Sequence, residues 1–310
     1  MPDIHLLVPC SAQKTNPASK KMCISTHKTP DLNQSLNAWS IAFNQTPERY
    51  SSSSLYTGQA FKFAKKLAKE NEFKLSILSA GFGLVESNTN LPCYNATFAS
   101  NVNRVPSPHP VWWSSVCDTH LPGISISKYV AAHPEERFVF CLSKEYINAV
   151  QEDLRHTLDS QALNSEKIII ITSSIPRTLQ PFKSQFVKVS RNILNHPKAK
   201  ECGLALTDRN IIYIATYLFV EQLRLTKASF NGIIQTLTKD LRSLSAPKRP
   251  IRVKRDNSFI LTFIEKELDK HHDASQTLLF KLYKEEGNAC ADTRFRSLYH
   301  KIKLTKAQRD

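Results

Sequence analysis

The chain predicts an α/β protein, with a mostly parallel sheet flanked by helices and a small helix-turn-helix-like module at the carboxyl end. Short aliphatic runs alternate with helical patterns through the first part of the chain, which is typical of strand-helix-strand units. A basic segment with two prolines then precedes the last helices. Its 310 residues are enough for about two domains. We therefore expect an α/β domain over residues 1–244, a linker over 245–255 and a helical module over 256–310.

The first element is an aliphatic run, residues 4–8, that predicts a buried strand. Pro9 ends it, because proline has no N–H to donate to a sheet. Cys10, Ser11 and Lys14 therefore lie just beyond the carboxyl end of a strand, where open α/β sheets bind their ligands. An ammonium near a thiol favours the nucleophilic thiolate, which makes Cys10 a candidate nucleophile. The alternative is a small buried cysteine, which is what most free cysteines are.

The next segment, residues 15–54, is rich in Ser, Thr, Asn, Lys and Pro, with an amphipathic piece at 36–43. Long loops in compact domains are usually functional or mobile. The lysines here suit a loop that lies against phosphates and equally a solvated loop. Residues 60–70 are a predicted helix, because apolar positions recur at helical spacing. Gly58 lies at its start, where free backbone amides can bind an anion, just after Tyr56.

A second buried strand is expected at residues 74–78, running into Ser79. Gly81 and Gly83 follow it directly. Glycines after a strand let the backbone approach a ligand closely, as in phosphate-binding loops, although this spacing is not the dinucleotide-binding fingerprint. The following residues, 91–97, are expected to be extended.

Further elements complete the predicted sheet. We expect strands at 137–142 and 167–172, with a helix at 146–158 between them, and an edge strand at 186–189. The pair Trp112-Trp113 is typical of a core or an interface, and the alternative is stacking on a base.

From Thr207 the pattern becomes helical. A helix at 211–223, capped by Asp208, is followed by one at 229–244. Gly287 is a predicted helix stop within the final module. The three short helices expected there cover residues 260–268, 276–285 and 292–302.

Basic residues of the linker and of the last helix are the predicted nucleic-acid contacts. The linker has five basic residues and no acidic one, and the whole chain has a formal net charge of +15 with a pI near 9.5. This charge favours a polyanionic partner. Small helical modules also serve as packing partners, but a basic last helix favours a DNA reader. We expect contacts from Lys248, Arg249, Arg252, Lys254, Arg255, Arg294 and Arg296.

The cysteines indicate the compartment. The seven are odd in number and scattered, and no pair has the Cys-x-x-Cys spacing of zinc or redox sites. Cys10, Cys23 and His27 are spaced irregularly, so free thiols in a reducing compartment are favoured over a metal site. The amino terminus shows no signal-peptide pattern, and the apolar runs, such as 168–171, are too short to span a bilayer. We expect a cytoplasmic protein with no metal, no cofactor and no membrane partner.

Three short motifs stand in order along residues 10–97. They comprise Cys10-Ser11 with Lys14, Leu55-Tyr56-Thr57-Gly58 with Phe61, and Ile77-Leu78-Ser79-Ala80 with Gly83-Leu84, Pro92, Tyr94 and Thr97. Together they resemble a superfamily of uncharacterised domains related to the YaaA peroxide-stress proteins. The chain departs from the usual pattern at Gly81-Phe82 and at Cys93.

The first motif, Pro9-Cys10-Ser11-Ala12-Gln13-Lys14, also resembles the Pro-Cys-Ser-x-x-Lys motif of archaeosine synthase. That family acts on the nitrile of 7-cyano-7-deazaguanine in tRNA. A bacterial counterpart, the DpdC family of 7-deazaguanine DNA-modification clusters, is implied to convert the same nitrile in DNA to an amide. The resemblance thus implies a DNA-modification enzyme. Its partners would be double-stranded DNA with a flipped base and other proteins of such a cluster.

Within this hypothesis each motif residue has a role. Cys10 attacks the nitrile carbon to form a thioimidate, and Lys14 favours the thiolate and protonates the nitrile nitrogen. Ser11, or backbone amides near the two glycines, stabilises developing charge. The tyrosines stack on the deazapurine or hydrogen-bond to it. The expected substrate-binding residues are Tyr56, Gly58, Ser79, Gly81, Gly83, Tyr94 and Asn95.

Two other classes of function stay open. One is a DNA-binding protein without catalysis, as in the YaaA resemblance, in which Cys10 is buried and the motifs shape a groove. The other is a glycosylase or base-exchange enzyme, which needs a carboxylate near the sugar. Glu86 is the acid beside the motifs, so this class ranks last. Faster alkylation of Cys10 than of the other six cysteines would favour the nucleophile.

Overall fold

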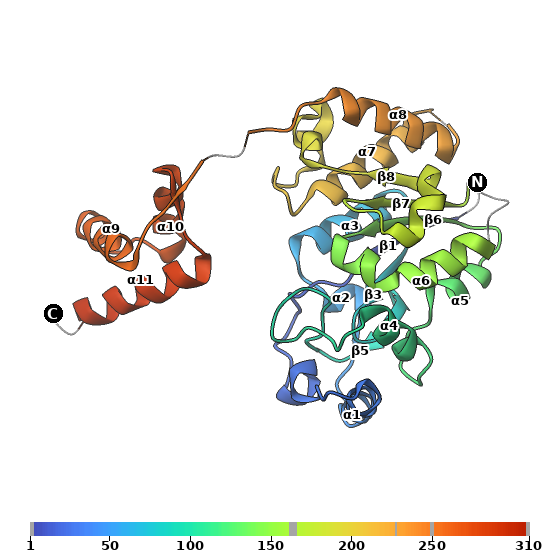
Figure 1. Ribbon diagram of the computed structural model, residues 1–310, viewed down its shortest axis with the longest axis horizontal. Helices are drawn as coiled ribbons and strands as arrows, with labels where there is room; N and C mark the ends of the chain where they lie inside the picture. Colours follow the sequence, from blue (N-terminus) through green and yellow to red (C-terminus); the bar gives the residue numbers. More distant parts are fainter. Residues whose placement is uncertain (1–2, 161–165, 227, 249–250, 308–310) are drawn as a thin grey trace. The chain divides into compact units, whose positions relative to one another are not determined.

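The computed structural model describes residues 3–160, 166–226, 228–248 and 251–307 (Figure 1). The chain divides into two compact units, Met1–Pro247 and Lys248–Asp310. Each unit has a hydrophobic core of its own.

A six-stranded sheet in the order β4-β3-β1-β6-β7-β8 forms the centre of the first unit. All neighbouring strands are parallel except β3 and β4, which are antiparallel. The predicted fold class is therefore confirmed, including the edge strand, β8. The strands are β1 (Ile4–Pro9), β3 (Lys74–Ser79), β4 (Gly83–Glu86), β6 (Arg137–Leu142), β7 (Ile168–Thr172) and β8 (Phe186–Lys188).

Strand β1 lies at the middle of the sheet, where both of its faces are covered. Leu6, Leu7 and Val8 are 0% exposed, as expected for an aliphatic run in a parallel sheet. The chain passes from β1 to β3 on one side and later crosses to β6 on the other side. Open sheets bind ligands at such a reversal of strand order, outside the carboxyl ends of the strands. Cys10 follows β1 at this point.

Helices cover both faces of the sheet (Figure 1). On one face, α3 and α7 contact each other and the strands, and α8 packs on α7 and β8. On the other face, α6 contacts β6 and β7 and packs against α4 and α5. The helices are α1 (Leu32–Asn44), α2 (Ser52–Leu55), α3 (Gln59–Glu70), α4 (His109–Cys117), α5 (Ile126–Ala131), α6 (Lys144–Ser160), α7 (Ile211–Thr226) and α8 (Phe230–Ser243).

Residues 15–54, expected as a polar loop with a docked amphipathic piece, contain helix α1. Asp31 caps it, because its carboxylate accepts a hydrogen bond from the backbone N–H of Asn33 at 2.8 Å. The indole of Trp39 is buried and donates to the carbonyl oxygen of Gly81 at 2.7 Å. The segment thus holds the turn that follows β3. Two short strands, β2 (Tyr50–Ser51) and β5 (Asn90–Leu91), also pair with each other.

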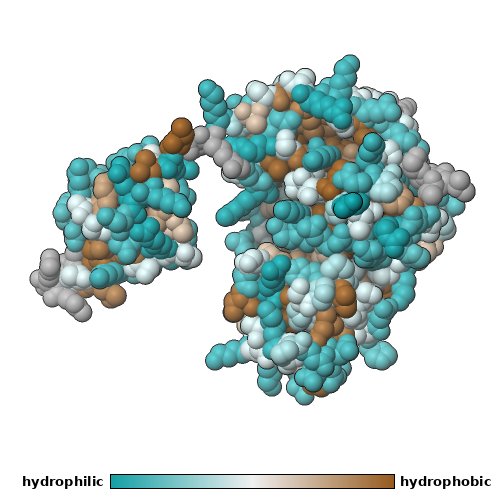
Figure 2. All heavy atoms as spheres, in the orientation of Figure 1, coloured by the Kyte–Doolittle hydropathy of each residue, from teal (hydrophilic) through white to brown (hydrophobic). Residues whose placement is uncertain are grey.

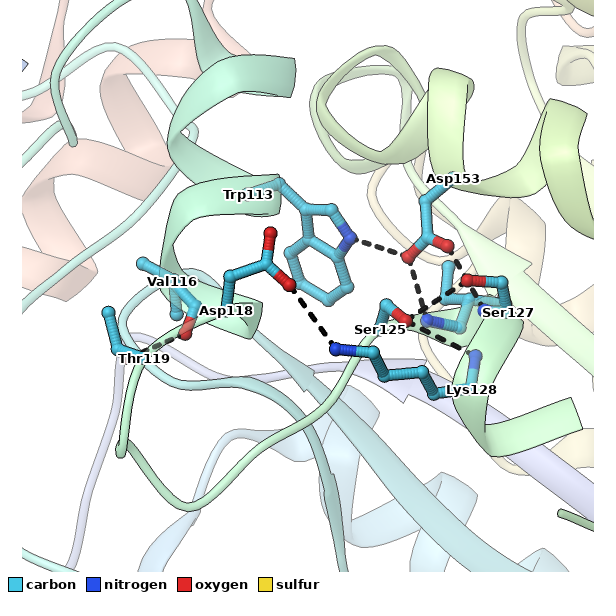
Figure 3. A network of polar contacts seen from close by, with 9 residues as sticks. Trp113, Val116, Asp118, Thr119, Ser125, Ser127, Lys128 and Asp153 are labelled. Carbon is cyan, nitrogen blue, oxygen red and sulfur yellow. Dashed lines mark hydrogen bonds and ion pairs between the residues drawn. The ribbon is translucent and has the colours of Figure 1, made fainter. Parts of the chain in front are cut away.

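A network of polar contacts fixes helix α6 against α4 and α5 (Figure 3). The carboxylate of Asp153 in α6 accepts hydrogen bonds from the Trp113 indole at 2.8 Å and from the backbone N–H of Ile126 and Ser127 at 2.7 and 3.0 Å (Figure 3). A carboxylate at the first turn of α5 also suits the helix dipole. Trp113 is buried in the core, which confirms the core interpretation of the Trp pair.

The second unit contains the three predicted helices and a two-stranded sheet. The helices are α9 (Asn257–Lys270), α10 (Gln276–Glu285) and α11 (Asp292–Ala307), and the strands are β9 (Val253–Lys254) and β10 (Asn288–Ala289). Gly287, with φ of 80°, follows α10 as predicted. Because β9 pairs with β10, the last residues of the predicted linker belong to this unit.

The visible surfaces of both units carry mainly hydrophilic side chains, with scattered hydrophobic ones (Figure 2). Among the described residues, every helix is too short or too polar to cross a membrane.

Candidate active site

Cys10 follows β1 directly and lies at the carboxyl ends of β1, β3 and β6. Its backbone N–H donates to the carbonyl oxygen of Leu78 in β3 at 2.9 Å, which anchors the residue beside that strand. Its side chain is half-buried. The Sγ atom lies 3.0 Å from the hydroxyl of Tyr146, in the first turn of α6 after β6. A thiol and a phenol from two neighbouring strand ends therefore meet at the point of strand reversal.

Three hydroxyl groups form a chain beside this contact. The Tyr56 and Tyr94 hydroxyls are 2.8 Å apart, and the Tyr94 hydroxyl is 2.6 Å from Ser79 Oγ. Ser79 Oγ also accepts a hydrogen bond from the backbone N–H of Gly81 at 3.2 Å. Burial raises the pKa of Tyr56 and Tyr94 well above the ordinary value, and the same holds for Tyr146. These phenols therefore remain protonated and can donate hydrogen bonds at neutral pH.

Lys14 lies beside the same hydroxyl chain. Its ammonium donates to the carbonyl oxygen of Ser11 at 3.1 Å and lies 4.3 Å from the centre of the Tyr94 ring. Burial lowers the pKa of Lys14, and the neighbouring cysteine sulfurs, Cys10 foremost, oppose this effect. Lys14 therefore releases its proton more readily than an exposed lysine does, which suits a proton donor.

Ser11 packs directly on the start of helix α3. Gly58 is the residue before this helix, as predicted, and it is buried. A Cβ atom at Gly58 would lie 2.2 Å from Ser11 Oγ, closer than side chains approach. The glycine thus allows the loop that carries Cys10 and Lys14 to lie against α3.

Replacing Gly58 with alanine should disturb this loop without straining the backbone. Gly58 has φ of −62° and ψ of 144°, which alanine adopts freely, so the effect comes from the contact with Ser11. We expect about a tenfold loss of the activity proposed below and a loss of about 1–2 kcal/mol in the free energy of unfolding. Denaturation curves and rates measure the two effects. The control is Gly232→Ala in α8, where an added Cβ meets nothing closer than 3.4 Å and should leave activity unchanged.

The two glycines after β3 are enclosed by protein groups, where the sequence favoured a close approach to a ligand. A Cβ at Gly81 would lie 3.0 Å from the Trp39 ring and 3.2 Å from the Tyr94 ring. Gly83, with φ of 79°, turns the chain into β4, and a Cβ there would lie 3.0 Å from Cys117 Sγ. The packing and the turn are thus sufficient physical reasons for glycine at both positions.

Other predicted substrate-binding residues also bond within the protein. Asn95 accepts a backbone hydrogen bond from Ile24 at 2.9 Å, donates one to Met22 at 2.7 Å, and its side-chain amide lies 3.5 Å from Cys23 Sγ. The Tyr56 and Tyr94 rings are 2% and 0% exposed. In this conformation the two rings offer no open face for base stacking. Their contribution to the candidate site is the chain of hydrogen-bonded hydroxyl groups.

Tyr146, beside Cys10, and His109 carried no predicted role. Tyr146 was placed only in a helix, although its position just after the β6 end, at the same sheet edge as Cys10, marks it as a site residue. The Phe98 ring contacts both residues: its centre lies 5.4 Å from the centre of the His109 ring and 5.1 Å from that of the Tyr146 ring. The Nε2 atom of His109 is buried, with no hydrogen-bond partner in the described parts of the chain. Burial lowers the pKa of His109, and the charges of Arg104 and Lys28 add to this.

The predicted nucleic-acid residues lie in the second unit, apart from Arg249, which falls outside the described residues. Several of them bond within the unit. Arg255 donates to Asn288 at 3.1 Å and Arg294 to Asn257 at 2.8 Å. Arg252 donates a hydrogen bond to the Lys284 carbonyl oxygen, and Arg296 forms an ion pair with Asp292. The side chains of Lys248 and Lys254 are exposed.

Comparison with known proteins gives one match. Residues 40–168 match a family of unknown function, DUF6884. This range includes α3, β3, the two tyrosines of the hydroxyl chain and Tyr146, and it begins after Cys10 and Lys14. No curated protein and no solved structure matches the chain.

Proposed function

We propose that the chain is an enzyme that hydrates the nitrile of 7-cyano-7-deazaguanine in DNA to the 7-amido group through a cysteine thioimidate. The observation that carries the proposal is the contact of Cys10 Sγ with the Tyr146 hydroxyl beside a half-buried Lys14, at the carboxyl end of β1. A candidate nucleophile and a candidate proton donor from one loop thus lie near a hydrogen-bond donor from α6. Such a convergence is typical of covalent catalysis.

The steps balance with water as the only co-reactant. The Cys10 thiolate forms a bond to the nitrile carbon, and the nitrile nitrogen takes a proton from Lys14. Water then adds to the thioimidate carbon, with one of its protons going to the nitrogen. The carbon–sulfur bond breaks, the thiolate leaves, and Lys14 takes the proton of the new hydroxyl as the amide forms. Cys10 and Lys14 return to their starting states.

The target base would have to leave the DNA duplex to reach a half-buried thiol. The net charge of +15 favours the DNA backbone as partner. All seven cysteines are free, which suits a reducing compartment, and we propose the cytoplasm as the location. The proposed reaction uses no metal and no cofactor. Other proteins of a DNA-modification cluster remain proposed partners.

The test is direct. The purified chain is incubated with double-stranded DNA that carries 7-cyano-7-deazaguanine, the DNA is digested to nucleosides, and the modified nucleoside is weighed. A gain of one water supports hydration. An unchanged mass with tight, salt-dependent binding contradicts it.

Replacing Tyr146 with phenylalanine should lower kcat for this hydration by about 10²-fold, because the hydroxyl that donates to the thiolate and to developing charge is lost. Burial of the ring is kept, so DNA affinity and stability should change little. The control is Tyr283→Phe, because the Tyr283 hydroxyl is buried without a hydrogen-bond partner among the described residues. Equal kcat values for the two variants would exclude Tyr146 from the reaction.

The second unit should supply part of the DNA affinity. Replacing Lys248 and Lys254 with glutamine removes two exposed charges, and the slope of log affinity against log salt should become shallower by about 1.8, near 0.9 per phosphate contact. The control removes two exposed lysines of α3, Lys62 and Lys69. Fluorescence anisotropy over a salt series gives the slopes. Equal slopes for the two double variants would contradict a contact of Lys248 and Lys254 with the DNA phosphates.

The second candidate function is DNA binding without catalysis, of the YaaA type. It is favoured by the hydroxyl chain, since Tyr56, Tyr94 and Ser79 are buried and satisfy one another's hydrogen bonds. In that case the motifs brace the fold beneath a binding surface. Alkylation separates the two functions: a nucleophilic Cys10 reacts faster than the other six cysteines, whereas a bracing Cys10 is protected.

A further inference from the structure

A second group of polar side chains lies at the opposite edge of the sheet, where β1 and β6 begin. His5 belongs to β1, and His133 and Glu136 lie in the connection from α5 to β6. One potential ligand atom of each residue lies within 4.8 Å of those of the other two. Residues far apart in the sequence thus bring two imidazoles and one carboxylate together.

The centre of this group is His5, which is 0% exposed. Its Nε2 atom faces the Oε2 atom of Glu136. The two atoms are in direct contact as an ion pair, and among the described residues neither makes a regular hydrogen bond. A cation that took the place of this direct contact would have the nitrogen and the oxygen as two of its ligands.

The second polar atom of each residue is already engaged. His5 Nδ1 lies 2.8 Å from the Tyr129 hydroxyl, and His133 Nδ1 lies 2.8 Å from the Tyr129 carbonyl oxygen. Glu136 Oε1 accepts a hydrogen bond from Lys74 at 2.7 Å. Outer partners of this kind orient metal ligands and fix the histidine tautomer. Each of the three residues is thus held by one atom, which leaves its other side-chain atom as the potential metal ligand.

We propose that His5, His133 and Glu136 bind a zinc ion. Two imidazole nitrogens and one carboxylate oxygen are ligands that zinc accepts, and three protein ligands leave a fourth position open. Ligand atoms of a tetrahedral zinc ion lie roughly 3.4 Å apart, as follows from bond lengths near 2.0–2.1 Å, so side-chain rotations are enough to close the site.

The surroundings suit this ion. The two histidines line a cavity of about 530 Å³, into which the fourth position would open. Lys74, which holds Glu136, is also paired with Asp3 at 2.9 Å, so the charges of the two carboxylates exceed that of the ammonium. This inference is independent of the proposed nitrile chemistry, because His5 and Cys10 lie at opposite ends of β1.

The test uses the full chain after dialysis against a chelator, titrated with zinc chloride and followed by calorimetry. We expect one equivalent to bind, with affinity at least about 100-fold lower in His133→Ala and clearly lower in Glu136→Gln, which also serves if the first variant fails to fold. The control is His156→Ala, which removes an exposed histidine of α6 and should bind as the unsubstituted chain does.

Cobalt(II) distinguishes this site from the cysteines. Binding at the proposed site gives the visible bands of a tetrahedral ion with nitrogen and oxygen ligands, and these bands disappear in His133→Ala. Intense near-ultraviolet thiolate bands, full affinity in both substituted chains, or no zinc binding at all would overturn the proposal. The last result would leave His5 and Glu136 as a plain hydrogen-bonded pair.

Discussion

Replacing Cys10 with alanine should abolish nitrile hydration while DNA affinity and stability are kept. The loss should be about 10⁴-fold or more, because removal of a covalent nucleophile in comparable hydrolases costs about 10⁶-fold in kcat. Cys10 is half-buried, and its backbone hydrogen bond to Leu78 does not depend on the side chain. The fold should therefore tolerate alanine. Nucleoside mass spectrometry over time gives the rate, and anisotropy gives the affinity.

The matched control is Cys290→Ala in the second unit, because Cys290 is also free and half-buried. It should hydrate the nitrile at the rate of the unsubstituted chain. Retained activity in Cys10→Ala would remove the thioimidate from the mechanism. Loss of both activity and DNA binding in Cys10→Ala would instead favour the bracing role of the second candidate function.

The sheet was largely predictable because its strands are aliphatic and buried on both faces. The strand expected at residues 137–142 has the same bounds as β6. The edge position of β8 was expected because residues 186–189 form only a short apolar stretch after the other strands. β4 was missed, because Gly81 and Gly83 indicated a loop. Helix α1 was predicted only in part, because its stability depends on tertiary contacts such as that of Trp39 with Gly81.

The candidate site was predictable only where motif and strand end coincide. Cys10, Ser11 and Lys14 follow a strand directly, so strand position alone places them at the sheet edge. Tyr146 lies in the helix that follows a later strand, and its distance from Cys10 depends on how β6 pairs with β1. The group of His5, His133 and Glu136 has no sequence signal, because no metal-binding spacing links residues that meet only through the sheet.

Replacing Lys14 with methionine should lower kcat by about 10²–10³-fold, because the proton donor to the nitrile nitrogen is lost. The methionine keeps an unbranched stem over the Tyr94 ring, so substrate affinity should change little. Because partial burial lowers the pKa of Lys14, the half-buried ammonium costs stability, and the variant should unfold at equal or higher denaturant concentration. A merely structural role would predict the opposite shift.

The pH dependence gives the sharper test of Lys14. If the protonated lysine is the donor, kcat falls as pH rises through its pKa, and because burial lowers that pKa the fall begins below the ordinary 10.5. This alkaline limb should be absent from the residual activity of Lys14→Met. The control is Lys62→Met in α3, which should keep the limb. A Lys14→Met variant with the same alkaline limb would show that another group supplies the proton, and Tyr146, already 3.0 Å from Cys10, would then take that role.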